Sequence, residues 1–264
     1  MSIDKNLQWD PKLYQKHSDL QFKLGLMAIK RLNPSSSERI LEIGSGNGLL
    51  TIEIARLIPK GEIVGIEISK EMMEQAKENS LRSGLNNIRY VNLDATNIQF
   101  KNEFDAVFSN SAIHWIKDLE LMYKLLYNSL KINGRIIIQT GLKQRNTMTD
   151  AIIRILSLKQ FRSFFKEFKI PWRFLTEKEN KKIIEAAKFS NVTIEFYPML
   201  YWFNSKNDLL GYLKSAAMVP FLSLLPNHLK SEFEKIFFKI YLEVNNQKLN
   251  FSNTRLFISA KKIY

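Results

Sequence analysis

A glycine-rich turn is the part of this sequence with the clearest chemistry. Gly44, Gly46 and Gly48 alternate with other residues directly after the apolar run 39–43. Glycine lets the backbone turn sharply and come close to a bound group, and a helix that begins at such a turn favours negative charge on that group. Glu67 follows 23 residues after Gly44, where a carboxylate can accept hydrogen bonds from both hydroxyls of a ribose. The pattern predicts a site for a ribose-containing cofactor.

The spacing of the turn argues against a dinucleotide. Dinucleotide sites use G-x-G-x-x-G, whereas this turn is G-x-G-x-G and follows Glu42, an acid two residues before the first glycine. A carboxylate there repels a pyrophosphate and can help to hold an ammonium group. A further acid, Asp94, ends the third predicted strand.

These residues fall on an alternation of strands and helices. The apolar runs predict strands at 39–43, 62–68, 88–93, 104–109 and 135–140, with helices at 49–58, 70–81 and 119–130 between them. Such an alternation is typical of an α/β fold with a parallel sheet that helices cover on both faces. Helical spacing over 12–32 adds an N-terminal helical region, closed by Pro34.

Residues 142–264 differ in composition, because they hold 14 of the 18 phenylalanines. Helical spacing appears in Phe161, Phe164, Phe165 and Phe168, and again over 233–240. We interpret both stripes as helix packing against the sheet; an acyl pocket is the alternative. Strands at 192–203 and 254–260 are expected to extend the sheet edge. Helices over 142–188 and 205–248 are expected to form a lid over its carboxyl end.

The predicted organisation therefore has three parts. Residues 1–37 form the helical region over the cofactor site, 38–141 the Rossmann-like core, and 142–264 the helical lid with the last two strands.

Composition excludes several classes of protein. The chain has 264 residues, 45% of them apolar and none of them cysteine, which excludes disordered chains, disulfide scaffolds and cysteine-based metal sites. Its three histidines are scattered, so no metal is expected. It shows no secretory signal and no run long enough to span a membrane, and the cytoplasm is the expected location.

The net charge of +13 is concentrated in the second half of the chain. Residues 1–141 hold 18 basic and 16 acidic residues, and residues 142–264 hold 21 and 10. Such a charge attracts acidic ligands, acidic proteins, anionic membranes or nucleic acid, and it is also found on ordinary solvated surfaces.

Four segments in order resemble the motifs of class I S-adenosylmethionine-dependent methyltransferases: LEIGSGNG (41–48), GIEIS (65–69), LDA (93–95) and FDAVFSNSAIHW (104–115). The resemblance implies a mostly parallel seven-stranded sheet with an antiparallel edge hairpin. It also implies S-adenosylmethionine as the cofactor, S-adenosylhomocysteine as the product, and no metal.

The resemblance also implies roles for single residues. Gly44, Ser45 and Gly46 would line the methionine part of the cofactor, and Glu67 would hold its ribose. Ile68 would pack on the adenine, Asp94 would accept from the adenine amino group, and Asn110 would border the methionine end. Glu42, Gly48 and Ala95 complete the expected cofactor site.

Within this family, the chain is similar to the trans-aconitate, malonyl-acyl-carrier-protein and juvenile-hormone-acid methyltransferases. The similarity rests on WDPKLYQKHSDLQ (9–21), on His114 and Trp115, and on DLLGYLKSAAMVPFLSLLP (208–226). It implies O-methylation of the carboxylate of a small or acyl-chain acid, with Gln21 and Trp115 beside that carboxylate. Each of these two residues has an alternative interpretation without a catalytic role: Gln21 can face solvent, and Trp115 can serve only in packing.

A carboxylate acceptor is ionised at pH 7 and needs no general base, whereas an alcohol or amine acceptor needs one. His114 is the candidate for that base, and an ordinary hydrogen-bonded histidine is the other interpretation.

An RNA methyltransferase is less favoured, because Asn110 is followed by Ser111 and Ala112 and not by the Pro-Pro-aromatic motif of base amino-group methylation. A protein that binds the cofactor without catalysis is a further alternative. The basic segment 143–188, with 12 basic and 5 acidic residues, can attract a free acid or an acidic carrier protein.

Overall fold

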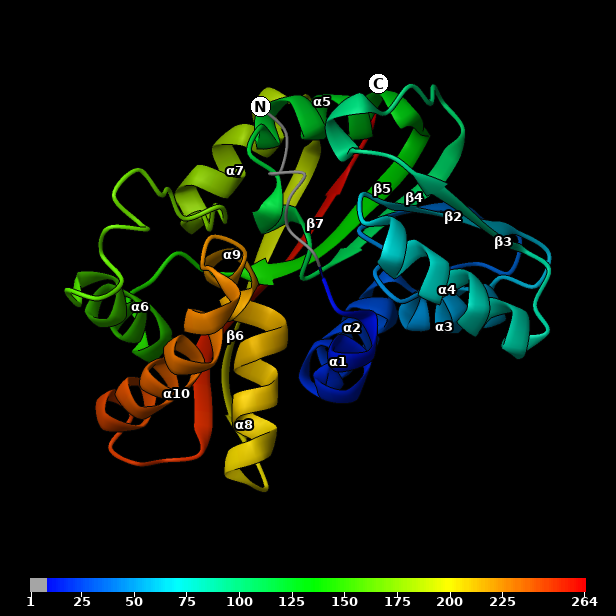
Figure 1. Ribbon diagram of the computed structural model, residues 1–264. Coiled ribbons are helices and arrows are strands. Elements are labelled where there is room, and N and C mark those ends of the chain that lie inside the picture. The colour runs from blue at the N-terminus through cyan, green and yellow to red at the C-terminus, as the bar shows by residue number, and fades with distance from the viewer. Residues whose placement is uncertain (1–8) are drawn as a thin grey trace.

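Seven strands form one mixed sheet, and in Figure 1 the last two strands of the chain reach down into the lower half of the molecule. The computed structural model describes residues 9–264; the first eight residues, part of the predicted N-terminal region, lie outside it. Along the chain the strands are β1 (Arg39–Ile43), β2 (Glu62–Glu67), β3 (Ile88–Asn92), β4 (Phe104–Asn110), β5 (Leu130–Gly141), β6 (Ser190–Trp202) and β7 (Asn250–Lys261). Their order in the sheet is β3-β2-β1-β4-β5-β7-β6, and β7 is antiparallel to both of its neighbours. The predicted α/β class and antiparallel edge pair are confirmed.

Helices cover both faces of this sheet (Figure 1). One face carries α2 (Asp19–Leu32), α3 (Leu49–Leu57) and α4 (Lys70–Ser83), and the other carries α5 (Leu119–Ser129) and α7 (Glu177–Ala186). The central strand β1 is apolar on both sides, because Ile40 joins the core under α2 and α3 whereas Leu41 joins the core under α5. This explains why the parallel strands are nearly continuous apolar runs.

The N-terminal helical region is two helices. α1 (Pro11–His17) is capped by the Asp10 carboxylate, which accepts from the backbone N–H groups of Lys12 and Leu13. Ser18 interrupts the helical course between α1 and α2. The apolar periodicity of 12–32 did not reveal this break.

The lid lies at the carboxyl end of the parallel strands. β5 ends at Gly141, opposite Arg255, so residues 250–254 of β7 pair only with β6. Around this extension pack α6 (Thr147–Ser157), α8 (Lys206–Leu213), α9 (Val219–Leu222) and α10 (Asn227–Val244), with a π-helical turn at Lys214–Met218 between α8 and α9 (Figure 1). The predicted helices over 205–248 are confirmed, and the three-part division of the chain stays a prediction.

The prediction of helix over the first phenylalanine stripe is wrong. Residues 158–176, between α6 and α7, form turns in which the N–H groups of Phe161, Phe164 and Phe168 donate to the carbonyl three residues earlier. A series of such turns places side chains at nearly the same intervals as an α-helix, so the pattern could not distinguish them. Phe161 and Phe165 are buried against Phe233 of α10. The stripe therefore packs on a helix and not on the sheet.

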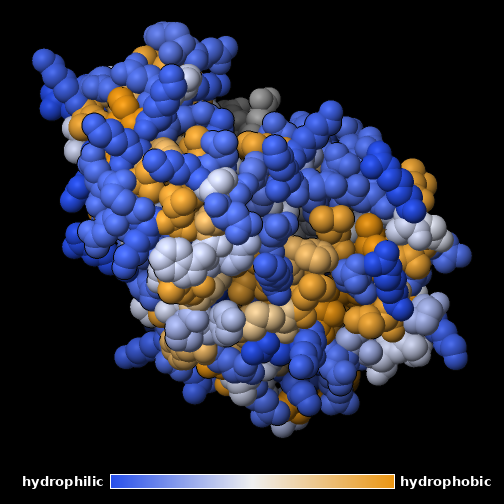
Figure 2. Space-filling model, turned by 90° about the horizontal axis from the view of Figure 1, so that it is seen from below, coloured by the Kyte–Doolittle hydropathy of each residue, from blue (hydrophilic) through white to orange (hydrophobic). Residues whose placement is uncertain are grey.

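The surface is mostly polar, although apolar side chains reach it. Figure 2, which views the molecule from below Figure 1, shows apolar side chains gathered in the middle of a largely polar face. The edge strand β6 exposes Leu200 and Trp202 by 58% and 57%. Within residues 9–264, no helix is long and apolar enough to cross a membrane.

Candidate active site

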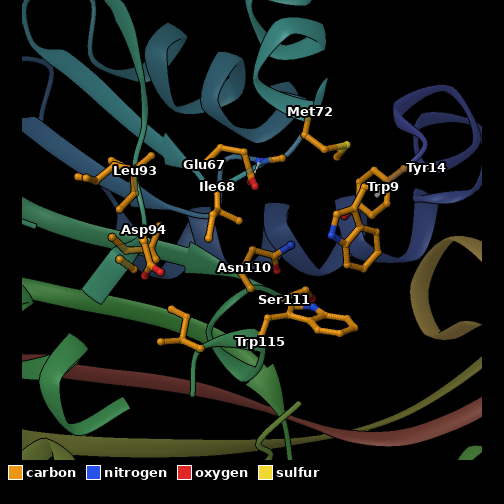
Figure 3. A pocket seen from close by; sticks show the side chains of 17 residues that line it. Trp9, Tyr14, Glu67, Ile68, Met72, Leu93, Asp94, Asn110, Ser111 and Trp115 are labelled. Carbon is orange, nitrogen blue, oxygen red and sulfur yellow. Dashed lines mark hydrogen bonds between the residues drawn. The ribbon is translucent and has the colours of Figure 1, made fainter. Parts of the chain in front are cut away.

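A cavity of about 850 Å³, including the part open to solvent, lies at the carboxyl ends of β1 to β4 (Figure 3). The parallel register puts the ends of β1, β2 and β4 side by side, with Ile43 opposite both Ile66 and Ser109. The order of the strands reverses between β1 and β4, which is where open α/β sheets bind their ligands. The residues that follow these strands therefore face one space.

The glycine turn forms one wall of this cavity. Gly44 and Gly46 both line it, with φ angles of +72° and +55° that only glycine adopts easily. A Cβ on Gly44 would stand 2.3 Å from the Cβ of Ala112. The turn therefore needs glycine for its backbone angle and also for its close approach to the segment after β4.

The Glu67 carboxylate lies at the end of β2 and lines the same cavity. Its Oε2 accepts from the Gly46 N–H at 3.0 Å, and its Oε1 accepts from the Ser69 N–H at 2.9 Å. Burial raises the pKa of Glu67, and these backbone donors act against that rise. Each oxygen keeps a free lone pair, so the carboxylate can accept from a pair of hydroxyls.

The far end of the cavity is apolar with one acid. Ile68, Leu93 and Ala95 line it beside Asp94, and Figure 3 shows Leu93 and Asp94 away from the aromatic side chains at the other end. Asp94 Oδ1 accepts from the N–H and the hydroxyl of Thr96, both at 2.8 Å. Its Oδ2 has no donor among residues 9–264, which leaves an acceptor for an amino group on a flat ring.

Asn110 stands near the middle of the cavity (Figure 3). Its Nδ2 donates to the Gln21 carbonyl at 3.0 Å, whereas its Oδ1 is buried without a partner in the described part of the chain. A buried acceptor without a donor costs free energy. The arrangement therefore suits a ligand with an N–H donor, such as an ammonium group.

Three predicted cofactor residues do not line this cavity. Glu42 is buried behind the turn, where its Oε2 accepts from the Thr51 hydroxyl at 2.5 Å, and burial raises its pKa to about 7. Gly48 faces α4, since a Cβ there would stand 2.9 Å from the Cβ of Ala76. Ser45 lies inward, with a buried hydroxyl that has no partner among residues 9–264. The structure thus places these three residues in support of the turn.

A second cavity of about 940 Å³, also counted with its open part, adjoins the first. Four residues line both cavities, namely Trp9, Tyr14, Ser111 and Trp115. The Trp115 ring meets Trp9 edge to face at 5.1 Å between centroids and Trp172 at 5.6 Å. The two spaces therefore meet beside Trp115, between aromatic side chains.

The predicted catalytic residues meet at this second cavity. Gln21, His114 and Trp115 all line it. His114 is buried and stacked on Phe174 at 4.6 Å, and its Nδ1 is 3.5 Å from the Thr140 hydroxyl. Burial and the positive charge of Arg255 lower the pKa of His114 to about 3. The imidazole is therefore neutral at pH 7 and a weak base.

Several lining residues were not predicted from the sequence. Trp9 and Tyr14 belong to the motif at 9–21, yet only their proximity in space identifies them as cavity walls. Arg255 was one basic residue among 39, and no local signal distinguishes it. Within residues 9–264, no group of three His, Cys, Asp or Glu side chains could hold a metal ion.

Comparison with known proteins identifies the family. A family model described as a methyltransferase domain matches residues 34–196, which is more than half of the chain. An uncharacterized methyltransferase of Schizosaccharomyces pombe is 31% identical over 69% of this chain and 70% of its own length. A malonyl-[acyl-carrier protein] O-methyltransferase of Bacillus anthracis is 26% identical over 66% and 64%. The juvenile hormone acid O-methyltransferase of Bombyx mori is 28% identical over 79% and 78%.

Solved structures agree on the fold. The YcgJ protein of Bacillus subtilis is similar with a TM-score of 0.65 and 18% identity over 92% of this chain and 99% of its own. Phosphoethanolamine N-methyltransferase 2 of Haemonchus contortus, in complex with S-adenosyl-L-methionine, is similar with a TM-score of 0.64 and 20% identity over 96% and 57%. The resemblance read from the four sequence motifs is thus confirmed, and the chain belongs to the methyltransferase-domain family.

Proposed function

We propose that this chain transfers the methyl group of S-adenosylmethionine to the carboxylate of a small or acyl-chain acid. One observation carries the proposal: the cavity with the acidic and glycine residues adjoins a second cavity, with which it shares Trp9, Tyr14, Ser111 and Trp115. The first space has the polar groups that the cofactor needs, and the second has room for an acceptor. The relatives named as carboxyl O-methyltransferases support the choice of a carboxylate.

The residues of the first cavity fit S-adenosylmethionine. Glu67 would hold the ribose hydroxyls, Asp94 Oδ2 the adenine amino group, and Asn110 Oδ1 the methionine ammonium group. The absence of a side chain at Gly46 leaves room for the methionine part of the ligand. Each of these groups is an acceptor, which matches a ligand that presents N–H and O–H donors at three places.

When bound, S-adenosylmethionine supplies a methyl group on a sulfonium, which leaves as a neutral thioether. The chain's own residues have to align the acceptor oxygen with that methyl group and exclude water, which is catalysis by proximity. Gln21 and Trp115, which both line the second cavity, would orient a carboxylate through an amide N–H and an indole N–H without protonating it. One carboxylate lone pair forms the new O–C bond, the S–C bond breaks, and no proton moves.

The state of His114 supports a carboxylate over an alcohol or an amine. An alcohol or ammonium acceptor has to lose a proton, and a histidine with a pKa of about 3 accepts one poorly at pH 7. No carboxylate contacts His114 among residues 9–264 to raise its basicity. A carboxylate acceptor makes no such demand.

The acid can be delivered free or on an acidic carrier protein. Lys159, Arg162, Lys166 and Lys169 are exposed on the turns between α6 and α7, so they can attract a negatively charged partner. Comparing turnover of a free acid with turnover of the same acid bound to its carrier would test whether a carrier protein delivers it.

The test is turnover of a panel of acids. Purified protein and S-adenosylmethionine are mixed with aconitate-like, fatty, isoprenoid and carrier-bound acids, and S-adenosylhomocysteine and cofactor affinity are measured. A methyl product that dilute base hydrolyses back to the acid supports the proposal and names the acid class. Cofactor binding without ester formation from any acid refutes the carboxylate acceptor and leaves amines, alcohols and RNA as the candidate acceptors. Lack of cofactor binding sinks the whole proposal.

A further inference from the structure

Arg255 is a buried positive charge in the wall of the second cavity. It lies on β7 opposite Gly141 of β5, and its side chain is only 7% exposed. A buried guanidinium normally pairs with a carboxylate, because burial of an unpaired charge is expensive. Among residues 9–264, no carboxylate lies within ion-pair distance of Arg255.

The groups that do hold Arg255 are neutral. Its Nη2 donates to the Ser111 hydroxyl at 2.8 Å and to Gln139 Oε1 at 3.2 Å. Its Nε is buried without a partner, and its Nη1 donates to no acceptor in the described part of the chain. The guanidinium is thus fixed in place by two hydrogen bonds while three of its five N–H groups stay unpaired.

Ser111 places this charge at the junction of the two cavities. It follows Asn110 at the end of β4 and lines both spaces. Its hydroxyl also donates to Gln139 Oε1 at 2.9 Å, which fixes it as the acceptor for Arg255. An anion bound by Arg255 would therefore lie next to the junction of the two cavities, where a methyl group would have to arrive.

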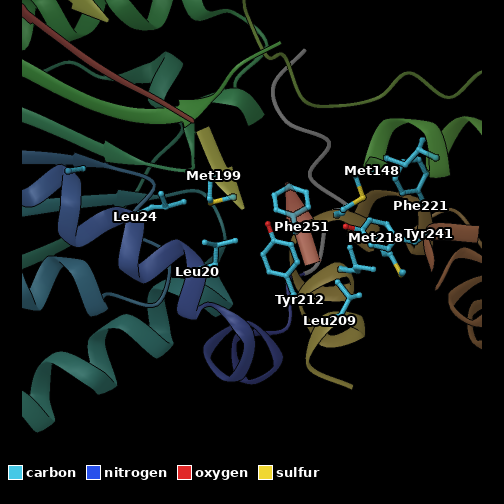
Figure 4. Close-up of a cluster of buried hydrophobic side chains, with 14 of the residues drawn as sticks. Leu20, Leu24, Met148, Met199, Leu209, Tyr212, Met218, Phe221, Tyr241 and Phe251 are labelled. Carbon is cyan, nitrogen blue, oxygen red and sulfur yellow. The ribbon is translucent and has the colours of Figure 1, made fainter. Parts of the chain in front are cut away.

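Apolar side chains from several elements also line the second cavity. Leu20 and Leu24 come from α2, Met148 from α6, and Tyr212 and Phe251 from α8 and β7. Figure 4 shows these side chains within one continuous hydrophobic cluster. Beside polar side chains such as Gln144, Asn146 and Asn253, the cavity therefore combines one fixed positive charge with apolar residues, which suits an acid that carries a hydrocarbon chain.

We propose that Arg255 binds the acceptor carboxylate itself, with the rest of the acid along the wall of Leu20, Leu24 and Phe251. This inference rests on the proposed function and goes beyond it by assigning the anion site and the amphipathic class of acid. It also accounts for product release. Methylation removes the negative charge, so the ester loses its attraction to the guanidinium and leaves.

Binding of three probes with similar hydrocarbon chains and different head groups tests the assignment. Octanoate, methyl octanoate and octylamine are titrated by calorimetry into the protein saturated with S-adenosylhomocysteine, so that no transfer can occur. Wild-type protein is expected to bind octanoate at least about tenfold more tightly than either analogue, since a charge-assisted hydrogen bond contributes about 1.5–3 kcal/mol. Arg255→Met should reduce this ratio to within about twofold.

Matched variants separate charge at the site from charge elsewhere. Arg154→Met removes an exposed arginine of α6 and should leave the octanoate preference unchanged. Arg255→Gln, which keeps an amide donor for Ser111, replaces Arg255→Met if that variant fails to bind S-adenosylhomocysteine. The assignment is overturned if wild-type protein shows no preference for octanoate, or if both Arg255 variants keep it.

The result also separates this inference from the proposed function. If octanoate preference depends on Arg255 but no acid is esterified, the anion site is supported and the proposed esterification is refuted. If the protein forms an ester and Arg255→Met still prefers octanoate, the proposed esterification is supported and the anion site is refuted.

Discussion

Gly46 and Glu67 are joined by a hydrogen bond in which the glycine N–H donates to the carboxylate Oε2 at 3.0 Å. The second oxygen of Glu67 accepts from the N–H of Ser69, the N-cap residue of α4. One side chain thus fastens the turn after β1 to the start of the helix after β2. The acid that would bind the ribose is also the group that holds the cavity wall in shape.

Glu67→Gln should therefore weaken cofactor binding strongly. The amide keeps the size of the side chain but replaces one acceptor with an NH2 group, which cannot satisfy both backbone donors and a ribose. Loss of a charged acceptor costs about 1.5–3 kcal/mol, or roughly 10- to 150-fold in S-adenosylhomocysteine affinity by calorimetry. Glu74→Gln, an exposed change on α4, is the control, and equal affinity in the two variants would contradict the role of Glu67.

Two glycines with the same backbone angle test the close approach of the turn. Gly44 and Gly84 have φ of +72° and +71°, yet an added Cβ meets Ala112 at 2.3 Å in the first case and nothing within 4 Å in the second. Gly84→Ala should lower the free energy of unfolding by the left-handed penalty alone, about 1–2 kcal/mol. Gly44→Ala should cost about 1–3 kcal/mol more, because it adds overpacking. Urea denaturation measures both, and equal losses would refute the contact with Ala112.

Glu42 should make the protein less stable as the pH rises from about 4.5 to about 7. Burial raises its folded-state pKa from 4.5 to about 7, so the native state holds a proton that the unfolded chain has already released in this interval. The loss amounts to about 3 kcal/mol and is complete above about pH 7. Glu42→Gln keeps an acceptor for the Thr51 hydroxyl and removes this proton. The difference in unfolding free energy between variant and wild type should grow with pH over the interval, and a constant difference would contradict the buried acid.

How far the site could be predicted depends on the distance in sequence between its parts. Gly44 and Glu67 were found because strand, turn and helix are local patterns, and because the acid recurs at a fixed interval after the glycine. The parallel register of β1 and β2 then brings the two together without further information. Glu42 and Gly48 carry the same local signal and yet face Thr51 and α4, because spacing alone does not say which side of a turn a residue occupies.

Arg255 could not be predicted in this way. It reaches Ser111, 144 residues earlier, only because β7 enters the sheet antiparallel beside β5. The prediction of a helix over the first phenylalanine stripe was wrong for a different reason. Turns closed by hydrogen bonds three residues apart place side chains such as Phe161 and Phe165 on one side, much as a helix does. Both cases need the tertiary structure.

Trp115→Phe should impair use of the acceptor. Trp115 lines both cavities, and its indole N–H is the donor proposed for the carboxylate. Phenylalanine preserves an aromatic wall but has no such donor, so kcat/KM for the acid should fall roughly 10- to 150-fold, because one hydrogen bond to a charged group contributes about 1.5–3 kcal/mol. Trp202→Phe, at an exposed position of β6, should leave kcat/KM unchanged. Unchanged kcat/KM in Trp115→Phe would show that the indole N–H does not donate to the acceptor carboxylate.

His114 distinguishes the two kinds of acceptor through pH. With its pKa lowered to about 3 by burial, the imidazole stays neutral over the working range, and an ionised acid gives it no proton to accept. The rate of esterification should therefore be flat between about pH 6 and 9, and His114→Gln should keep most of it. A rate that rises with pH through an ordinary histidine pKa in wild type, and becomes flat in His114→Gln, would make His114 a base and sink the carboxylate acceptor.

The same shift makes a prediction for stability that does not depend on the substrate. The unfolded chain binds a proton at His114 below about pH 6.5, whereas the folded chain binds it only below about 3. Stability from this residue is thus fully present above pH 6.5 and is lost as the pH falls, by about 2 kcal/mol at pH 5. Urea denaturation of wild type and His114→Gln at pH 7.5 and pH 5 measures this loss, which should be absent from the variant. An equal loss in both proteins would mean that His114 is not held neutral, and the case against a histidine base would fail with it.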